Sequence, residues 1–314
     1  MIKQEINELK RLYTPSNCSI TRICGCYVDG EKNKKTEFKE AFLSLPEEEI
    51  FKYFELLRKT LSGSLGKNLL NLDFPLASEQ EGGTQAALLA LRDSKLKDDA
   101  LIEEFYDRVI NTYEYVGNYL ILLIHDAYDV PGKTTDGLTM DDASDTVFEY
   151  IMCCICPVNL SKPGLSYDNI NNEFHNRIRD WVVEMPETGF LFPSFNDRAT
   201  DIHSTLFYSK NPEEAHSEFV ENILGCTMPL SAGTQKEAFQ ALIEETLGDE
   251  VEYEVVKNIH ENLTEMIEEH KEIPEPLTLD KHQVKSLFEK SGVKEEKLTD
   301  FDKLYDAAAG EDTS

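Results

Sequence analysis

The chain has 314 residues, 40% of them hydrophobic and 29% charged, and its formal net charge is −29. This length and apolar content are enough to bury a sizeable core, so we expect one large domain or two smaller ones. The acidic excess repels duplex nucleic acid and anionic membranes, which argues against a function that needs direct contact with either. The excess is densest in residues 211–314, which hold 26 acids and 9 bases. Such a surface is either simply solvated or complementary to a basic protein partner.

The sequence favours a cytoplasmic location. Residues Met1–Glu5 are polar, and no apolar segment of the kind found in signal peptides follows them. No apolar run approaches the roughly 20 residues that a membrane-spanning helix needs. The seven cysteines, an odd number, are expected to be free thiols in a reducing compartment.

Apolar residues at helical spacing predict four helices in the first third of the chain, over residues 3–12, 44–61, 84–92 and 97–115. Residues 19–28 are rich in β-branched and aromatic side chains and predict a strand. A basic loop at Lys32–Lys35 follows this strand. The short apolar run at 69–74 fits either a helix or a strand.

Two uninterrupted apolar runs, 119–124 and 150–158, dominate the middle of the chain. Runs of this length and composition predict strands that are covered on both faces. A loop rich in Gly and Asp, 126–145, connects them. The second run leads into an irregular connection rich in Asn, Pro and Gly. After it we expect a hairpin, a turn and a final strand, over residues 181–192, 196–198 and 204–208.

After residue 211 the pattern becomes helical. Helices are predicted over residues 213–224, 235–247 and 253–270, and Ile273–Pro276 resembles a linker before two further short helices. The fold class expected is α+β, with a mixed sheet and flanking helices. The expected division is an α+β core (1–210), an acidic helical segment (211–272) and a small helical unit (277–310).

Several segments together resemble one known family. They are Ile20–Val28, Leu61–Asn68, Gly117–Leu123, Cys156–Val158, Glu173–Arg177 and Gly189–Arg198. This set resembles a bacterial family of uncharacterised proteins, the domain-of-unknown-function 4317 family, over nearly the whole chain. The resemblance implies a cytosolic bacterial protein, and it implies no activity, ligand or catalytic residue.

Five cysteines lie in two predicted strands: Cys24 and Cys26 in one, and Cys153, Cys154 and Cys156 in the other. Alternate residues of a strand share a face, so the two groups would meet if the strands were neighbours. Zinc ligands usually come from turns, however, and cysteine also packs as a small buried apolar residue. We therefore predict structural cysteines, with no bound metal and no cofactor.

Two other patterns resemble sites only in part. His125–Asp126 follows an apolar run and forms a possible acid–base pair, but adjacent strand residues point to opposite faces. Gly63–Asn68 contains Gly66–Lys67 but lacks the spacing and the hydroxyl residue of a phosphate-binding loop. We interpret the first as structural and the second as the end of a helix.

The remaining candidate site is a group of bases in an acidic chain. Its predicted anion-binding residues are Arg22, Lys162, His175, Arg177, Arg179 and Arg198. Arginine side chains bind carboxylate and phosphate oxygens through two parallel hydrogen bonds. The alternative is that these bases pair with nearby acids such as Asp168, Asp180, Asp197 and Asp201.

Two functions are compatible with these patterns. The first is a non-enzymatic binding or regulatory protein that meets a protein partner through its acidic C-terminal third. The second is an enzyme or sensor that acts on a phosphate-bearing or other anionic small molecule. A concave pocket lined by the predicted bases would favour the second.

Overall fold

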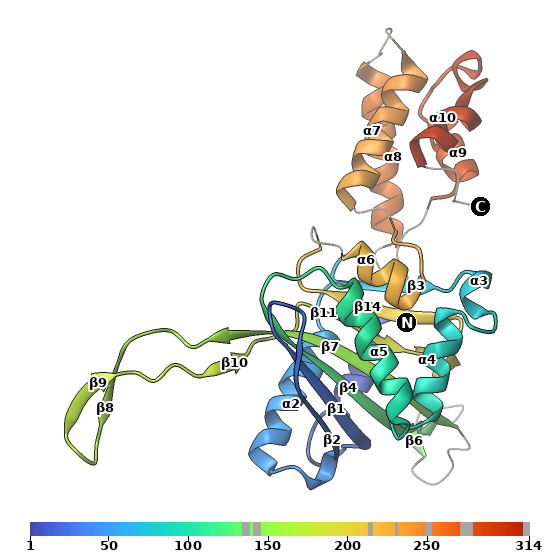
Figure 1. Cartoon of the computed structure of the whole chain (residues 1–314). Helices are drawn as coiled ribbons and strands as arrows, with labels where there is room; N and C mark the ends of the chain where they lie inside the picture. The colour runs from blue at the N-terminus through green and yellow to red at the C-terminus, as the bar shows by residue number, and fades with distance from the viewer. Residues whose placement is uncertain are drawn as a thin grey trace. The chain divides into compact units, whose positions relative to one another are not determined.

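The computed structural model describes residues 1–133, 139–140, 146–212, 216–229, 232–248, 253–270 and 279–309. The chain divides into two compact units, Met1–Met228 and Pro229–Ser314. The first unit is built on an eight-stranded sheet, and the described part of the second is helical (Figure 1). The predicted α+β class is confirmed. The sheet is antiparallel at every described strand pairing, however, rather than mixed.

The sheet has the order β2-β1-β4-β7-β11-β14-β3, with β10 also paired to β7. The strands are β1 (Ile20–Val28), β2 (Lys34–Ala41), β3 (Leu69–Asp73), β4 (Asn118–Asp129), β7 (Val147–Leu160), β10 (Trp181–Val183), β11 (Thr188–Phe192) and β14 (Ser204–Ser209). The two apolar runs form β4 and β7, and β4 pairs over its whole length with Val147–Val158 of β7. Both are buried on both faces over most of that length, as their composition predicts.

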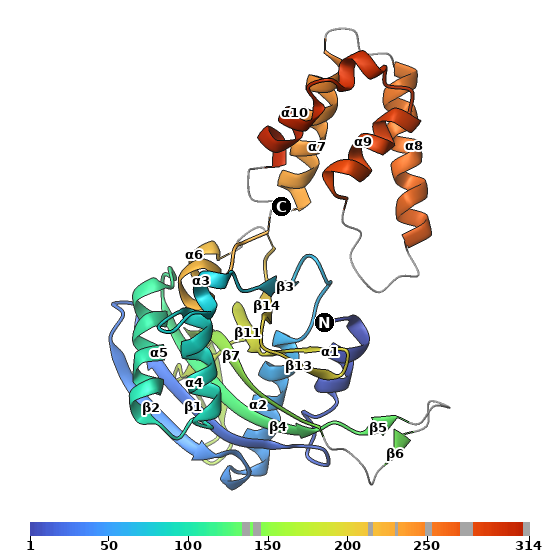
Figure 2. The same ribbon diagram turned by 90° about the vertical axis from the view of Figure 1, so that its right-hand side faces the viewer.

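Helices cover both faces of the sheet (Figure 2). On one face, α4 (Thr84–Asp93) and α5 (Asp99–Thr112) share a core with alternate residues of β4, among them Ile121 and Leu123. On the other face, α1 (Lys3–Lys10) and α2 (Glu47–Thr60) share a second core with the intervening residues, such as Leu122. The period-2 alternation of β4 thus divides its side chains between two cores.

Gly189 of β11 leaves no room for a side chain. A Cβ atom at this position would lie 2.3 Å from the carbonyl oxygen of Cys153 and 2.9 Å from Cγ2 of Thr60 on α2. Glycine therefore lets β7, β11 and α2 pack tightly at one point.

The unit boundary lies between residues 228 and 229, later than the boundary at 210 that the sequence suggested. The difference comes from a short helical segment made of α6 (Ser217–Phe219) and a π-helical turn (Val220–Leu224). Its apolar side chains are buried in the core beneath α4 and α5.

The second unit is formed by α7 (Ala232–Leu247), α8 (Tyr253–His270), α9 (Lys281–Lys290), a 3₁₀ turn (Glu295–Leu298) and α10 (Phe301–Ala309). Ile259 on α8, Phe288 on α9 and Phe301 on α10 belong to one buried cluster. The helices that the sequence assigned to two separate segments therefore share a core. The expected linker at 273–276 lies outside the described residues.

Three local expectations differ from the structure. The basic loop at Lys32–Lys35 leads directly into β2, because the alternating polar residues that follow form an edge strand. Residues 181–192 do not form a hairpin, since β10 and β11 both pair with β7. The ambiguous run at 69–74 forms the edge strand β3. None of the helices in the described ranges is long and apolar enough to cross a membrane.

Candidate functional site

A two-stranded ribbon projects from the sheet where β7 and β10 end (Figure 1). Beyond β7 the chain forms β8 (Leu165–Asp168) and returns through β9 (Glu173–Asn176). The register does not change along it, because Leu160 pairs with Trp181 and Leu165, five residues on, pairs with Asn176, five residues back. The connection at 159–179, expected to be irregular, thus contains a short hairpin in the same register as β7 and β10, although residues 161–164 and 177–180 between the two strand pairs are not in strands. We call residues 160–183 the arm.

Local hydrogen bonds close the tip of the arm. The Asp168 carboxylate accepts the backbone N–H groups of Ile170 (2.8 Å) and Asn171 (3.3 Å), which is how Asp commonly stabilises a turn. The rings of Tyr167 and Phe174 lie across the two strands with centroids 5.2 Å apart. Such cross-strand aromatic pairs stabilise a β-ribbon and help to fix its register.

The two faces of the ribbon differ in chemistry. Residues directly opposite each other in an antiparallel pair share a face. Leu165, Tyr167 and Phe174 lie on one face, which we call the apolar face, and their exposed fractions are 76%, 53% and 72%. The opposite face, the polar face, carries Ser166, Asp168, Glu173 and His175. The ribbon is thus amphipathic, and its apolar face is exposed.

Exposed apolar side chains continue along the arm and just beyond it. They are Leu160, Ile170, Ile178, Trp181, Val182, Val183 and Met185. The charges are balanced, since residues 161–183 hold three bases and three acids in a chain whose net charge is −29. The arm is therefore an apolar and electrically neutral projection from a strongly acidic protein.

Four of the six predicted anion-binding residues lie on the arm and are exposed: Lys162, His175, Arg177 and Arg179. Arg179 donates from Nε to the carbonyl of Ser161 (2.7 Å), and the backbone N–H of Arg177 bonds to the carbonyl of Gly164 (2.9 Å). The four lie along a projecting ribbon rather than in a concave pocket.

Arg198 lies in a different place. It occupies the turn between β12 (Ser194–Asn196) and β13 (Ala199–Asp201), where it forms an ion pair with Glu8 and donates to the carbonyl of Pro131 (2.8 Å). Pro131 follows the end of β4 that pairs with the first residue of β7, whereas the arm begins at the last residue of β7. The 14 residues of β7 therefore place Arg198 roughly 45 Å from the base of the arm. Arg198 is thus paired internally, as the alternative foresaw, but with a distant residue rather than with Asp197 or Asp201.

Arg22 lies near the same end of β4, at a β-bulge. Both Thr21 and Arg22 oppose His125 there, because the register shifts between Ile20 and Arg22. The Thr21 hydroxyl bonds to His125 Nδ1 (2.7 Å), and His125 Nε2 lies 3.8 Å from the Glu149 carboxylate. Burial lowers the pKa of His125, so the neutral ring is favoured. The Nε atom of Arg22 is buried and has no hydrogen-bond partner among the described residues.

Asp126 points away from His125, as the strand geometry predicts. Its carboxylate accepts a hydrogen bond from the Tyr150 hydroxyl (2.6 Å), which lies 2.9 Å from the hydroxyl of Tyr13. Burial raises the pKa of Asp126, because this side chain is wholly enclosed on the α1 and α2 side of the sheet. His125 and Asp126 therefore belong to separate clusters and do not form an acid–base pair.

Comparison with known families identifies the chain. The model of the family described as Domain of unknown function (DUF4317) matches residues 1–314. The chain belongs to this family. A comparison with curated proteins gave no match.

The cysteines of this DUF4317 chain do not converge. Cys24, Cys26 and Cys153 lie in the core beneath α4 and α5, whereas Cys154 and Cys156 lie in the core on the opposite face. Strand β4 also separates β1 from β7. Burial raises the pKa values of Cys26 and Cys154 to about 12, which keeps both as unreactive thiols. Within the described ranges, no three His, Cys, Asp or Glu side chains are placed to hold a metal ion together.

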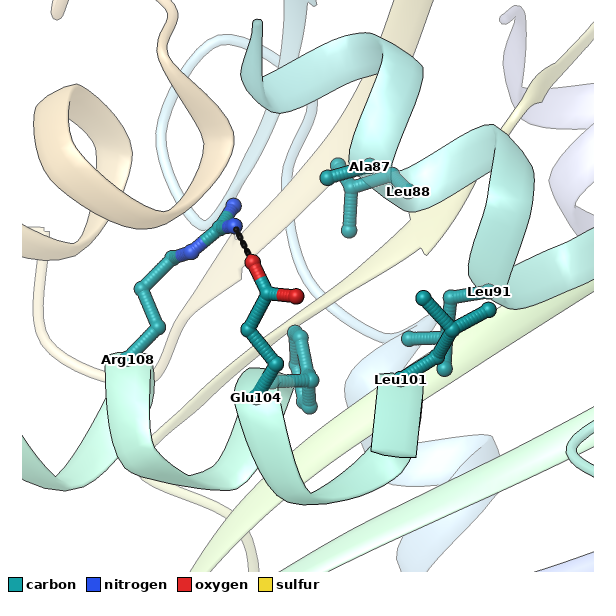
Figure 3. Close-up of a pocket in the computed structure, with 7 residues that line it drawn as sticks. Ala87, Leu88, Leu91, Leu101, Glu104 and Arg108 are labelled. Carbon is teal, nitrogen blue, oxygen red and sulfur yellow. Dashed lines mark hydrogen bonds and ion pairs between the residues drawn. The ribbon is translucent and has the colours of Figure 1, made fainter. Parts of the chain in front are cut away.

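A small hollow in this DUF4317 chain lies between α4 and α5 (Figure 3). Leu88, Leu91 and Leu101 line it, and the ion pair between Glu104 and Arg108 (3.2 Å) lies at one side. Its volume of about 20 Å³ is room for a single water molecule rather than for a metabolite. None of the predicted anion-binding residues lines this hollow.

Proposed function

We propose that this protein is a non-enzymatic binding protein that docks a protein partner on the apolar face of its arm. The observation that carries the proposal is the amphipathic ribbon, with Leu165, Tyr167 and Phe174 exposed on one face and polar residues on the other. A two-stranded hairpin is marginally stable in water unless its apolar face is covered. Exposed apolar surfaces of this kind mark interaction sites.

The composition of the arm supports a protein partner. Aromatic residues, Met and Arg are enriched at protein interfaces, and Trp, Tyr and Arg supply most of their binding energy. The arm and its base carry Tyr167, Phe174, Trp181, Met185 and two arginines in exposed positions. A nucleic-acid partner is disfavoured because the arm is neutral and the chain as a whole is strongly acidic.

The C-terminal unit offers a second surface for the same function. Residues 229–314 hold 22 acids and 9 bases, a net charge of −13. We propose that this unit adds electrostatic attraction toward a basic protein partner, which would raise the rate of association. The proposal also places the protein in the cytoplasm, where its seven free cysteines would stay reduced.

Site-specific photocrosslinking tests the proposal. A photoreactive residue at position 165, on the apolar face, is compared with one at 166 on the polar face and one at Leu43. Leu43 is an exposed apolar residue that follows β2 at the opposite end of the sheet. We expect a discrete protein adduct in cells from position 165, and much less from 166 and 43. The exchange Phe174→Ser should remove that adduct while leaving the protein folded. Equal adducts at all three positions, or an adduct that persists in Phe174→Ser, would contradict the proposal.

One observation favours a second candidate, the binding of a small anion at Arg22. This arginine is half-buried, and its Nε lacks a hydrogen-bond partner among the described residues. It lacks this partner although the chain has 60 acidic residues. The test is the thermal shift caused by phosphate or sulfate. Saturable stabilisation that is lost in Arg22→Gln supports this site, whereas loss only in the Arg177→Ala, Arg179→Ala double variant places the anion on the arm. No shift with either ion removes this candidate.

A further inference from the structure

The outer edge of β9 carries backbone groups that have no partner in the described part of the chain. The N–H of Arg177 donates to the carbonyl of Gly164 (2.9 Å), so this pair of residues is hydrogen-bonded within the ribbon. Bonded and non-bonded pairs alternate along an antiparallel ladder. His175 is therefore also bonded inward, and the backbone groups of Phe174 and Asn176 point away from β8.

The side chains along this edge are complementary in charge to those of a second, antiparallel copy of the same edge. Glu173, His175 and Arg177 occupy alternate positions, so an acid and a base flank the imidazole ring. When two such strands pair antiparallel about His175, Phe174 lies opposite Asn176 of the second copy. These are the residues whose backbone groups point outward, so each pair can exchange two hydrogen bonds.

In the same register, Glu173 lies opposite Arg177 of the second copy, and the pairing occurs twice because of the two-fold symmetry. These are non-hydrogen-bonded pairs, in which cross-strand side chains come closest and opposite charges attract. A shift of the register in either direction would lose this match or leave the outward backbone groups unpaired.

We propose that the arm pairs with the arm of a second copy of this chain, edge to edge through β9, antiparallel and centred on His175. The edge lacks the proline and lysine residues that proteins use to block edge pairing, since residues 173–177 read Glu-Phe-His-Asn-Arg. An interface that meets its own copy in this way is two-fold symmetric, the commonest arrangement in homo-oligomers.

The length of the arm lets two acidic copies meet. The ribbon residue opposite His175 is Ser166, eight residues beyond Val158, the last buried residue of β7. Eight residues of extended chain span about 26 Å. The separation between the sheets of the two copies is therefore well above the screening length of about 8 Å at physiological salt. The arm itself is neutral, and repulsion between the copies is therefore small where they touch.

Pairing also changes the apolar face. A four-stranded sheet replaces two separate two-stranded ribbons, which makes each ribbon more stable. Leu165, Tyr167 and Phe174 of both copies then lie on one continuous face. Few residues of each copy take part, compared with roughly 20–30 in a standard interface. The dimer should therefore be weak and should form as the protein concentration rises.

Charge exchange tests the register with the full-length protein. Sedimentation should show a mass that rises above 35.8 kDa toward twice that value with increasing concentration. Glu173→Lys alone and Arg177→Glu alone should each abolish the rise, because each places like charges opposite each other. The double variant should restore it. The proposal fails if the wild type stays monomeric, or if the double variant remains as monomeric as the single ones.

A cysteine at the symmetry axis gives an independent measurement. Non-hydrogen-bonded residues on adjacent strands lie about 4.5 Å apart, a distance that a disulfide spans. Under mild oxidation His175→Cys should form a covalent dimer, whereas Ser166→Cys, directly across the same ribbon, should form at least tenfold less. Equal yields would overturn the register. The inference concerns the edge of the ribbon, so a monomer that still crosslinks a partner from position 165 refutes it and leaves the proposed function intact.

Discussion

Deleting the arm should leave the protein as stable as before, or more stable. The change removes residues 162–179 and joins Ser161 to Asp180 through an Asn-Gly turn. The N–H of Ser161 already bonds to the carbonyl of Asp180 (2.8 Å), so the two ends lie at hairpin distance. The removed residues are almost all exposed, and their loss takes little apolar area out of the core.

The magnitude follows from the length of the removed segment. Shortening the connection from 18 residues to two is about three halvings, each of which lowers the entropic penalty of closure by about 0.6 kcal/mol. The free energy of unfolding should therefore change by between about 0 and +2 kcal/mol. In a unit of this size, 1 kcal/mol corresponds to about 2–4 °C in Tm.

Scanning calorimetry on matched variants measures this change. Phe174→Ala, on the arm, should leave Tm nearly unchanged, because its side chain is 72% exposed. Phe190→Ala, in the core of β11 with no exposed area, should cost about 3–5 kcal/mol. A fall in Tm of more than a few degrees on deleting the arm would show that the arm supports the core. In that case the argument for a free docking element would be refuted.

Three further predictions concern the body of the protein. Gly189→Ala should lower the free energy of unfolding by at least about 1–3 kcal/mol, because its Cβ would meet the Cys153 carbonyl; Gly164→Ala, which meets nothing within 4 Å, should not. Burial raises the pKa of Asp126, so its stabilising contribution is complete below the unfolded pKa of about 3.9 and is lost as pH rises through the raised value. The difference in Tm between Asp126→Asn and the wild type should therefore shift in favour of the variant as the pH rises from 4 to 7. A difference that stays constant with pH would contradict this. Cutting between residues 228 and 229 should give two fragments that each melt cooperatively, and a first fragment without a transition would refute that boundary.

The sequence predicted the elements whose side chains are buried in a regular pattern. The apolar runs gave β4 and β7, and the helical stripe at Ile102, Phe105 and Val109 gave α5. The alternation rule also placed His125 and Asp126 on opposite faces. In each case the residues that face the core are apolar and recur at the period of the helix or strand, so the element can be recognised in the sequence.

The arm could not be predicted in this way, because its side chains are almost all exposed and do not pack in a core. Its Pro163-Gly164 and Asn-rich tip are typical of irregular loops, and each of its strands has only four residues. The alternation of Leu165 with Tyr167 was the available signal, and it is too short to distinguish from chance. The pairing of Arg198 with Glu8 joins residues 190 positions apart, and such contacts depend on the tertiary fold.

The position of Trp181 determines what fluorescence can report about this protein. It is the single tryptophan of the chain, it lies at the base of the arm on β10, and it is 55% exposed. Its emission spectrum should already resemble that of a solvated indole in the native state, so unfolding of the two cores would change it little. A blue shift would instead signal that something has covered the base of the arm. Trp181 fluorescence should therefore report the binding of a partner at the base of the arm, whereas unfolding of the protein should change its emission very little.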